Sequence, residues 1–387
     1  MPHLIELRKQ GQSFWLDGLT RDMLENGELE RRVHDQGLSG IACNSAMFYE
    51  ALNSSTVYDD AIQSKASMQQ PIDFMYWDLV TADVQQACDL LSPVYQRSKT
   101  NDGYVSLGVL PHLAHDADAT LRQARHLWDR VRRPNLLVQV PGTRECMPVI
   151  EELLYLGINV NVTLLFSLQT YWETFQNYMQ ALERRLEAGM TLKPVYAVAS
   201  FFLSPVDEAV ESVLRQRVSE KINSRHQAEQ LLGQVAIANA RFAYASFRAL
   251  IASERWHRLE KKGAIPQRIA WGSSTFSTSQ SSEFKYIESL IGPYTISLMQ
   301  EVTADAFDDD GDVSASVQQQ RKVARSTMDN LKKLGINFDT LNSIIMDECI
   351  KESIDLHDKT IRLLADRAAA MCNSDSVIGG YTRHYKP

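Results

Sequence analysis

The chain has 387 residues, of which 44% are hydrophobic and 23% charged, and its formal net charge is −8. This composition suits one large domain or two small ones with ample core. The acidic balance and the lack of any long Lys/Arg run argue against nucleic acid or an anionic membrane surface as partner. No signal peptide is apparent, and no apolar run approaches the roughly 20 residues of a membrane span. We expect a cytoplasmic protein with reduced thiols, because its cysteines are scattered and form no CxxC pair.

Short apolar runs and helical patterns alternate along the chain. Strands are expected at 13–18, 37–44, 104–111, 136–140, 158–167, 193–204, 268–274 and 294–301. Helical patterns fill most of the intervals, and the longest of them covers 207–253. Beyond the last strand, 315–372 is mostly helical and 373–387 is a polar tail.

This alternation predicts a parallel sheet with helical crossovers. Eight such units fit a closed (β/α)8 TIM-type barrel, here a single domain over 1–387 with additional C-terminal helices at 315–372. No GxGxxG or Walker A string follows any of the strands, which weakens nucleotide-binding interpretations.

The stretch RPNLLVQVPGT at 133–143 contains the most unusual strand. It is apolar except for Gln139, which lies between Val138 and Val140. A buried amide without hydrogen-bond partners costs about 1–3 kcal/mol. Gln139 must therefore face a polar pocket or join a hydrogen-bond network.

Other predicted strands also carry polar residues, and sites in such barrels lie at the C-terminal strand ends. Asn159, Asn161 and Thr163 recur at period two, so they share one face of their strand. The remaining polar residues at strand ends are Asp17, Asn44, Ser200, Ser273, Ser274, Gln300 and Glu301. So many polar strand ends indicate a ligand cavity.

The strings FWLDGLTRDMLENGEL, RPNLLVQVPGT, GINVNVTLLFSL and ESLIGPYTISLMQEVTADAF resemble transaldolases of the longer bacterial type, from about 11 to 311. The resemblance implies a (β/α)8 barrel that moves a dihydroxyacetone unit between sugar phosphates. It also implies a lysine Schiff base and no metal or organic cofactor.

At several site positions the chain departs from the family pattern. Gln139 stands where the family has its nucleophilic lysine, and a carboxamide cannot form an imine. Gly108 replaces a relay glutamate, Pro205 a phosphate-binding arginine, and Ser277 a loop lysine. These differences predict a less polar, unphosphorylated and bulkier ligand.

Other site residues match the family. By resemblance, Asp17 is the acid/base carboxylate and Thr163 the relay hydroxyl, so Asp17, Gln139 and Thr163 form the predicted catalytic set. The predicted substrate-binding set is Asn44, Gly108, Asn161, Ser200, Ser273 and Phe276. Met47 and Phe48 could add apolar lining beside Phe276.

Four other residues invite functional interpretations. His112 and His115 in PHLAHD fit helix capping or packing better than a metal site, and no residue set has zinc-ligand spacing. Cys43 should point away from the lumen if Asn44 points in. Lys193 would lie at the N-terminal end of the barrel, away from the site.

We therefore favour an enzyme repurposed from transaldolase chemistry for acid/base reactions on a small molecule, such as C–C bond formation or cleavage, cyclisation or dehydration. Asp17 would be the general acid or base, and Gln139, Asn44 and Asn161 would polarise a carbonyl or a hydroxyl in the manner of an oxyanion hole. Specialised-metabolite biosynthesis is a setting suggested by analogy. The alternatives are a catalytically silent binding or scaffold protein and a working transaldolase. The oligomeric state stays open.

Overall fold

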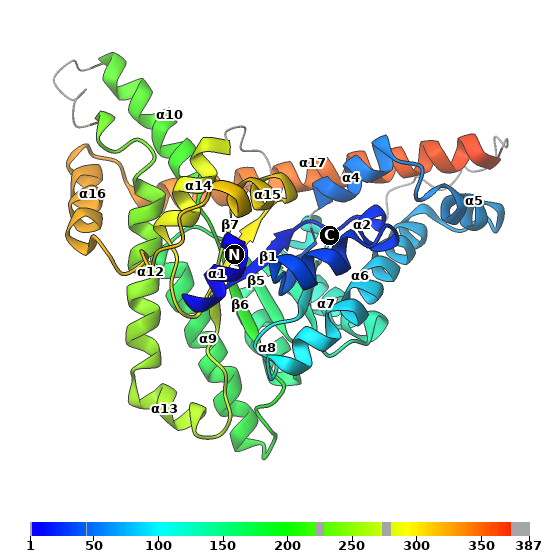
Figure 1. Ribbon diagram of the computed structural model, residues 1–387, viewed down its shortest axis with the longest axis horizontal. Coiled ribbons are helices and arrows are strands. Elements are labelled where there is room, and N and C mark those ends of the chain that lie inside the picture. Colours follow the sequence, from blue (N-terminus) through cyan, green and yellow to red (C-terminus); the bar gives the residue numbers. More distant parts are fainter. Residues whose placement is uncertain (1, 44, 221–227, 273–279, 373–387) are drawn as a thin grey trace.

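The computed structural model describes residues 2–43, 45–220, 228–272 and 280–372, and in these eight parallel strands close into a barrel in sequence order (Figure 1). The strands are β1 (Gln12–Asp17), β2 (Gly40–Ala42), β3 (Tyr104–Gly108), β4 (Leu136–Pro141), β5 (Val160–Leu165), β6 (Ala197–Phe202), β7 (Arg268–Gly272) and β8 (Thr295–Met299). The predicted (β/α)8 barrel is confirmed.

Helices surround the barrel, as expected for crossovers that bury both faces of a parallel sheet. They are α1 (His3–Lys9), α2 (Arg21–Glu25), α3 (Glu28–Arg31), η1 (Arg32–Gln36), α4 (Ser45–Ser54), α5 (Asp59–Ser67), α6 (Ile72–Arg97), η2 (Pro111–Leu113), α7 (Ala117–Val131), α8 (Met147–Leu156), α9 (Leu168–Glu187), α10 (Ser204–Glu220), α12 (Val235–Ile251), α13 (Glu254–Glu260), α14 (Gln280–Ser289), α15 (Glu301–Asp310), α16 (Arg321–Lys333) and α17 (Phe338–Cys372). None of the described helices is long and apolar enough to cross a membrane.

Strand register aligns the central site residues across three neighbouring strands. Gly108 of β3 pairs with Gln139 of β4, which pairs in turn with Asn161 of β5. Because side chains alternate between the two faces of a strand, residues at one register level share a face. The three positions therefore lie side by side inside the barrel.

Two predicted segments have different bounds in the structure. The long helical stretch expected over 207–253 comprises two helices, α10 and α12, and residues 221–227 lie outside the described part of the chain. The last strand ends at Met299, so Gln300 is the N-cap of α15 and Glu301 its first residue. Glu301 accepts a hydrogen bond from Arg32, and the prediction that it belongs to the end of the last strand is wrong.

Asn159 also differs from its prediction. It precedes β5, and its amide donates to the carbonyls of Pro134 and Leu136 at 2.9 and 3.1 Å. Its side-chain oxygen accepts from the Tyr196 N–H at 2.9 Å. Asn159 thus fastens the N-terminal edges of neighbouring strands and does not belong to the cavity described below.

The N-terminal end of the barrel is closed by a buried charged network. Arg268 of β7 forms an ion pair with Asp102 at 2.9 Å and donates to Ser13 Oγ at 2.6 Å. Asp102 also accepts a hydrogen bond from Ser13 at 2.8 Å. The rings of Tyr104, the first residue of β3, and Tyr196, which directly precedes β6, stack with centroids 4.5 Å apart. We refer to Arg268, Asp102 and Ser13 as the basal network.

The long C-terminal helix α17 has 35 residues and packs against α4, α5, α6, α10 and η2 (Figure 1). Near its end, Arg367 donates hydrogen bonds to the carbonyls of Leu52 and Ser55 and pairs with the Asp59 carboxylate. These contacts fasten α17 to the loop region between α4 and α5. The helix therefore has a defined position beside the C-terminal strand ends.

Candidate functional site

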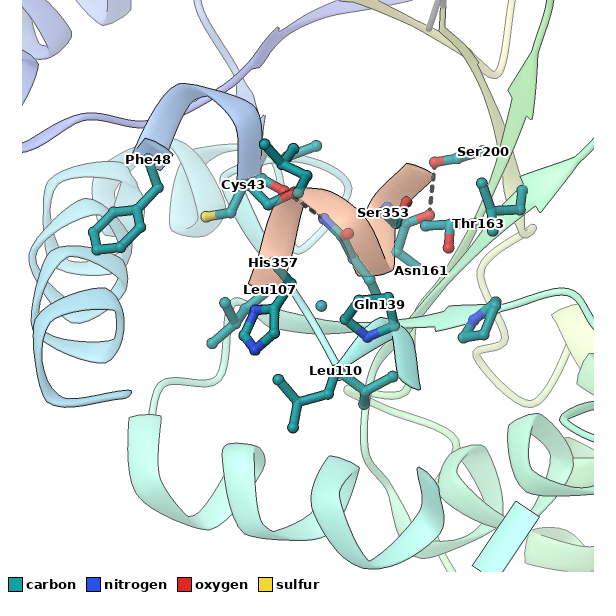
Figure 2. A pocket seen from close by; sticks show the side chains of 18 of the residues that line it. Cys43, Phe48, Leu107, Leu110, Gln139, Asn161, Thr163, Ser200, Ser353 and His357 are labelled. Atoms are coloured by element: carbon teal, nitrogen blue, oxygen red, sulfur yellow. Dashed lines mark hydrogen bonds between the residues drawn. The ribbon is translucent and has the colours of Figure 1, made fainter. Parts of the chain in front are cut away.

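A cavity of about 250 Å³ lies at the C-terminal ends of the strands. Its inner part is polar and includes Asp17, Gln139, Asn161, Thr163 and Ser200. Its outer part is mostly apolar and is formed by α4, α6, the segment after β3, and α17 (Figure 2). A concave site with few polar groups on an apolar wall is typical of small-molecule binding.

Gln139 both joins a network and faces the cavity. Its amide nitrogen donates to the Ser106 carbonyl at 3.1 Å. More weakly, it donates to the Cys43 carbonyl at 3.4 Å (Figure 2). A carboxamide has two N–H donors, so both are used by the backbone. The prediction that Gln139 polarises a carbonyl by donating to it does not fit this orientation, whereas its oxygen can accept from a ligand.

Gly108 lies directly beside that oxygen. A Cβ added at Gly108 would be 3.4 Å from Gln139 Oε1, at the edge of ordinary contact. Any longer side chain at position 108 would extend against Gln139 and reduce the space around it. The glycine thus leaves the Gln139 oxygen accessible from β3.

Asn161 is held between two hydroxyls. Its amide donates to Ser106 Oγ at 3.1 Å, and the Ser200 hydroxyl donates to its oxygen at 2.8 Å. All three residues are at most 2% exposed. We call these three residues the luminal network; it leaves one amide proton and one oxygen lone pair of Asn161 for a ligand.

A bulge in β5 brings two consecutive residues to the cavity. The register with β6 shifts between Val162 and Leu165, and Leu164 has a φ of +58°. Side chains of consecutive strand residues normally point to opposite faces, but Thr163 and Leu164 both line the cavity. Bulges often re-aim side chains beside active sites.

Two carboxylates, Asp17 and Asp83, line the cavity. Asp83 forms an ion pair with Arg21 at 2.7 Å and accepts from the Tyr58 hydroxyl at 2.8 Å, which gives it a structural role. Asp17 ends β1 and is partly exposed. The following Gly18 has a φ of +128°, and a Cβ there would lie 2.5 Å from Met47 Cγ, so only glycine suits this turn.

The wall formed by α17 was not predicted from the sequence. It comprises Cys349, Ile350, Ser353, Leu356 and His357. Nothing local in a 35-residue amphipathic helix shows which of its faces covers the barrel mouth, so this set had no usable sequence signal. Phe48 lines the same part of the cavity, as expected, whereas Asn44, Ser273, Ser274, Phe276 and Ser277 lie outside the described residues.

The remaining sequence predictions have mixed outcomes. Asp116 caps α7 by accepting from the Ala119 N–H at 2.9 Å, and the exposed His115 pairs with Glu145. No metal-binding cluster occurs within the described residues. Lys193 is exposed just before β6, at the N-terminal end of the barrel. Cys43 does line the cavity, contrary to expectation, but burial raises the pKa of its thiol, which disfavours a thiolate nucleophile.

The closed parallel barrel and the polar cavity at its C-terminal strand ends place the chain in the class of (β/α)8-barrel proteins with a small-molecule site. The family model for transaldolase/fructose-6-phosphate aldolase matches residues 14–362. A protein named transaldolase 2 from Nostoc punctiforme is 38% identical over 91% of this chain and 93% of its own length. Transaldolases of Trichodesmium erythraeum and Thiobacillus denitrificans are 36% and 37% identical, over 91% and 90% of this chain and 93% and 95% of their own. The chain belongs to the transaldolase family.

These relatives correct the favoured functional prediction. A repurposed enzyme for unphosphorylated molecules was inferred from a few substitutions, among them Gln139, Gly108 and Pro205. Likeness to proteins named transaldolase extends over about 91% of the chain and supports the transaldolase alternative instead. A few single positions are weaker evidence of function than likeness over most of the chain.

Proposed function

We propose that this chain catalyses the transaldolase reaction, in which a dihydroxyacetone unit passes between sugar phosphates. The observation that carries the proposal is the 36–38% identity to proteins named transaldolase over about 91% of the chain. The polar inner cavity supports it, because a carboxylate, amides and hydroxyls suit a polyhydroxylated substrate.

Asp17 is the group that we assign to proton transfer. As the C–C bond of the donor ketose breaks, its carboxylate takes the proton of the hydroxyl that becomes the aldehyde. The electron pair of the broken bond stays on the three-carbon fragment. In the second half-reaction that pair attacks the acceptor aldehyde, and Asp17 returns the proton to the new hydroxyl. Positioned acid/base groups of this kind contribute about 10²–10⁴-fold.

Asn161, Thr163 and Gln139 would orient the substrate. Asn161 is preorganised by Ser106 and Ser200 and offers one donor and one acceptor. Gln139 offers an accepting oxygen for a substrate hydroxyl, with Gly108 leaving room beside it. Thr163 lies at the bulge of β5 and would relay protons to and from bound water.

The side chain at position 139 limits how the three-carbon fragment can be held during the reaction. No lysine occurs among the described residues that line the cavity, and the Gln139 carboxamide does not form imines. We therefore expect the three-carbon fragment to be held at this site as an enediolate by hydrogen bonds. Sodium borohydride added during turnover of fructose 6-phosphate should leave no three-carbon adduct on the protein in a mass spectrum, and such an adduct would contradict this route.

The test is release of glyceraldehyde 3-phosphate from fructose 6-phosphate in the presence of erythrose 4-phosphate. Wild-type protein should show turnover, and Asp17→Asn should lower kcat by about 10²-fold or more. Asp22→Asn, an exposed carboxylate four residues after Gly18, is the matched control and should retain full activity. Absence of turnover in purified, folded wild-type protein would reject the proposal.

A further inference from the structure

Helix α17 brings a histidine into the outer part of the cavity. His357 lines the cavity and is only 8% exposed. Leu107, Leu110 and His357 line the same cavity as Gln139 (Figure 2). His357 is far from Gln139 in the sequence, and the fold brings both residues to the same cavity.

The imidazole is held by ring contacts rather than hydrogen bonds. The ring of Tyr76 from α6 meets it edge-on with centroids 5.1 Å apart, and the ring of His112 from η2 does so at 5.6 Å. His112 Nε2 in turn lies 3.1 Å from a carboxylate oxygen of Asp358. Among the described residues, no partner hydrogen-bonds a ring nitrogen of His357.

The ring nitrogens of His357 are not among the buried polar atoms that lack a partner, so they are accessible from the cavity, where a ligand can hydrogen-bond them. Burial, together with the nearby His112, lowers the pKa of His357 to about 4, although Asp358 acts in the opposite direction. The ring is therefore neutral near pH 7, with one N–H donor and one accepting nitrogen. This combination matches an alcohol hydroxyl, which also donates and accepts.

We propose that His357 hydrogen-bonds a hydroxyl of the substrate chain where that chain extends from the lumen toward α6 and η2. The C-terminal helix is then part of the binding site, and His357 is a residue that determines substrate affinity. The inference rests on the proposed function for the identity of the ligand, a sugar phosphate with several hydroxyls. The proposal adds a substrate-contacting residue on α17 to those at the strand ends.

Kinetics separate this role from packing. His357→Phe keeps a ring against Tyr76 and removes both polar atoms, so it should raise KM for fructose 6-phosphate about 10-fold, the loss of one hydrogen bond. Its kcat should change less than twofold and its melting temperature should not fall. His112→Phe is the matched control, because it makes the same chemical change in a ring that does not line the cavity. Equal KM changes in the two variants would overturn the proposal.

A direct measurement uses wild-type protein labelled with ¹⁵N-histidine and titrated with fructose 6-phosphate. The proposal expects the His357 ring signals to shift while staying in the range of a neutral imidazole. A shift into the imidazolium range would overturn it, because the ligand contact would then be the phosphate. Unshifted His357 signals with shifted Asn161 amide signals would overturn it and leave the proposed function standing. Binding at His357 without any turnover would support this contact and reject the transaldolase assignment.

Discussion

Two buried polar networks lie at opposite ends of the same barrel and differ in kind. The basal network contains a full ion pair, Arg268 with Asp102, and none of its three residues lines the cavity at the C-terminal strand ends. The luminal network of Ser106, Asn161 and Ser200 is uncharged and borders a cavity of about 250 Å³.

The difference in charge and in access to a cavity indicates that the two networks have different roles. A buried charge must keep its partner, because removal of one member of a buried pair costs about 3–5 kcal/mol. The basal network therefore serves stability. The luminal network keeps hydrogen-bonding capacity unused, which is expensive for stability and useful for binding. This matches the general division of (β/α)8 barrels, in which the C-terminal face carries chemistry.

The largest effect is expected at the basal end. Asp102→Ala leaves the Arg268 guanidinium buried without its carboxylate, so the free energy of unfolding in urea should fall by about 3–5 kcal/mol. The fraction that stays folded should keep its kcat, because the change is remote from the cavity. An Asp102→Ala variant with normal stability but a lower kcat would contradict the assignment of the basal network to stability.

Low pH should reduce the free energy of unfolding through His357, which lies at the cavity end of the barrel. The pKa of His357 is about 4 in the folded protein, against about 6.5 in the unfolded chain. As pH falls through this window, the unfolded state binds a proton that the folded state does not. The free energy of unfolding should therefore decrease from pH 6.5 to 4, by at most about 3 kcal/mol from this group.

The His357→Phe variant has no titrating group at this position. Its comparison with the wild type therefore isolates the contribution of His357 to the pH dependence of stability. Carboxylates also titrate near pH 4, so the informative quantity is the difference between the urea-unfolding curves of variant and wild type at several pH values. The variant should lose less stability than the wild type between pH 6.5 and 4. Parallel pH profiles would show that His357 titrates normally.

A smaller effect on stability, with a larger one on activity, is expected for Asn161→Ala. The change leaves Ser106 and Ser200 without their shared partner, which should cost about 1–3 kcal/mol of unfolding free energy. The ratio kcat/KM should fall about 10- to 100-fold, because the substrate loses an oriented amide. A loss of stability without a loss of kcat/KM would show that the luminal network, like the basal network, has only a structural role.

The smallest effect concerns salt. No Lys or Arg is among the described residues that line the cavity. We therefore expect KM for fructose 6-phosphate to change less than about twofold between 0.05 and 0.3 M salt, since screening acts on charged contacts. A steep rise of KM with salt would point to a cation outside the described lining.

The barrel was predictable because each strand is a short apolar run and the runs alternate with helical patterns. The luminal residues Asp17, Gln139, Asn161 and Ser200 followed from their positions near strand ends, and all four line the cavity. Alternation along a strand carries this information locally.

Three aspects of the site were not predictable in this way. The direction of the Gln139 amide depends on the carbonyls of Cys43 and Ser106, which come from two other strand segments. The bulge at Leu164 is a backbone irregularity in an otherwise regular apolar pattern. His357 reaches the cavity through long-range packing of α17, which no local pattern encodes.

The most direct test of the transaldolase assignment follows carbon rather than turnover. Fructose 6-phosphate labelled with ¹³C at C1 is incubated with erythrose 4-phosphate and the protein, and the products are identified by NMR. The account predicts that the label appears at C1 of sedoheptulose 7-phosphate, and that Asp17→Asn slows its appearance about 10²-fold or more. Label that stays in fructose 6-phosphate, or that is released only as free dihydroxyacetone, would contradict it.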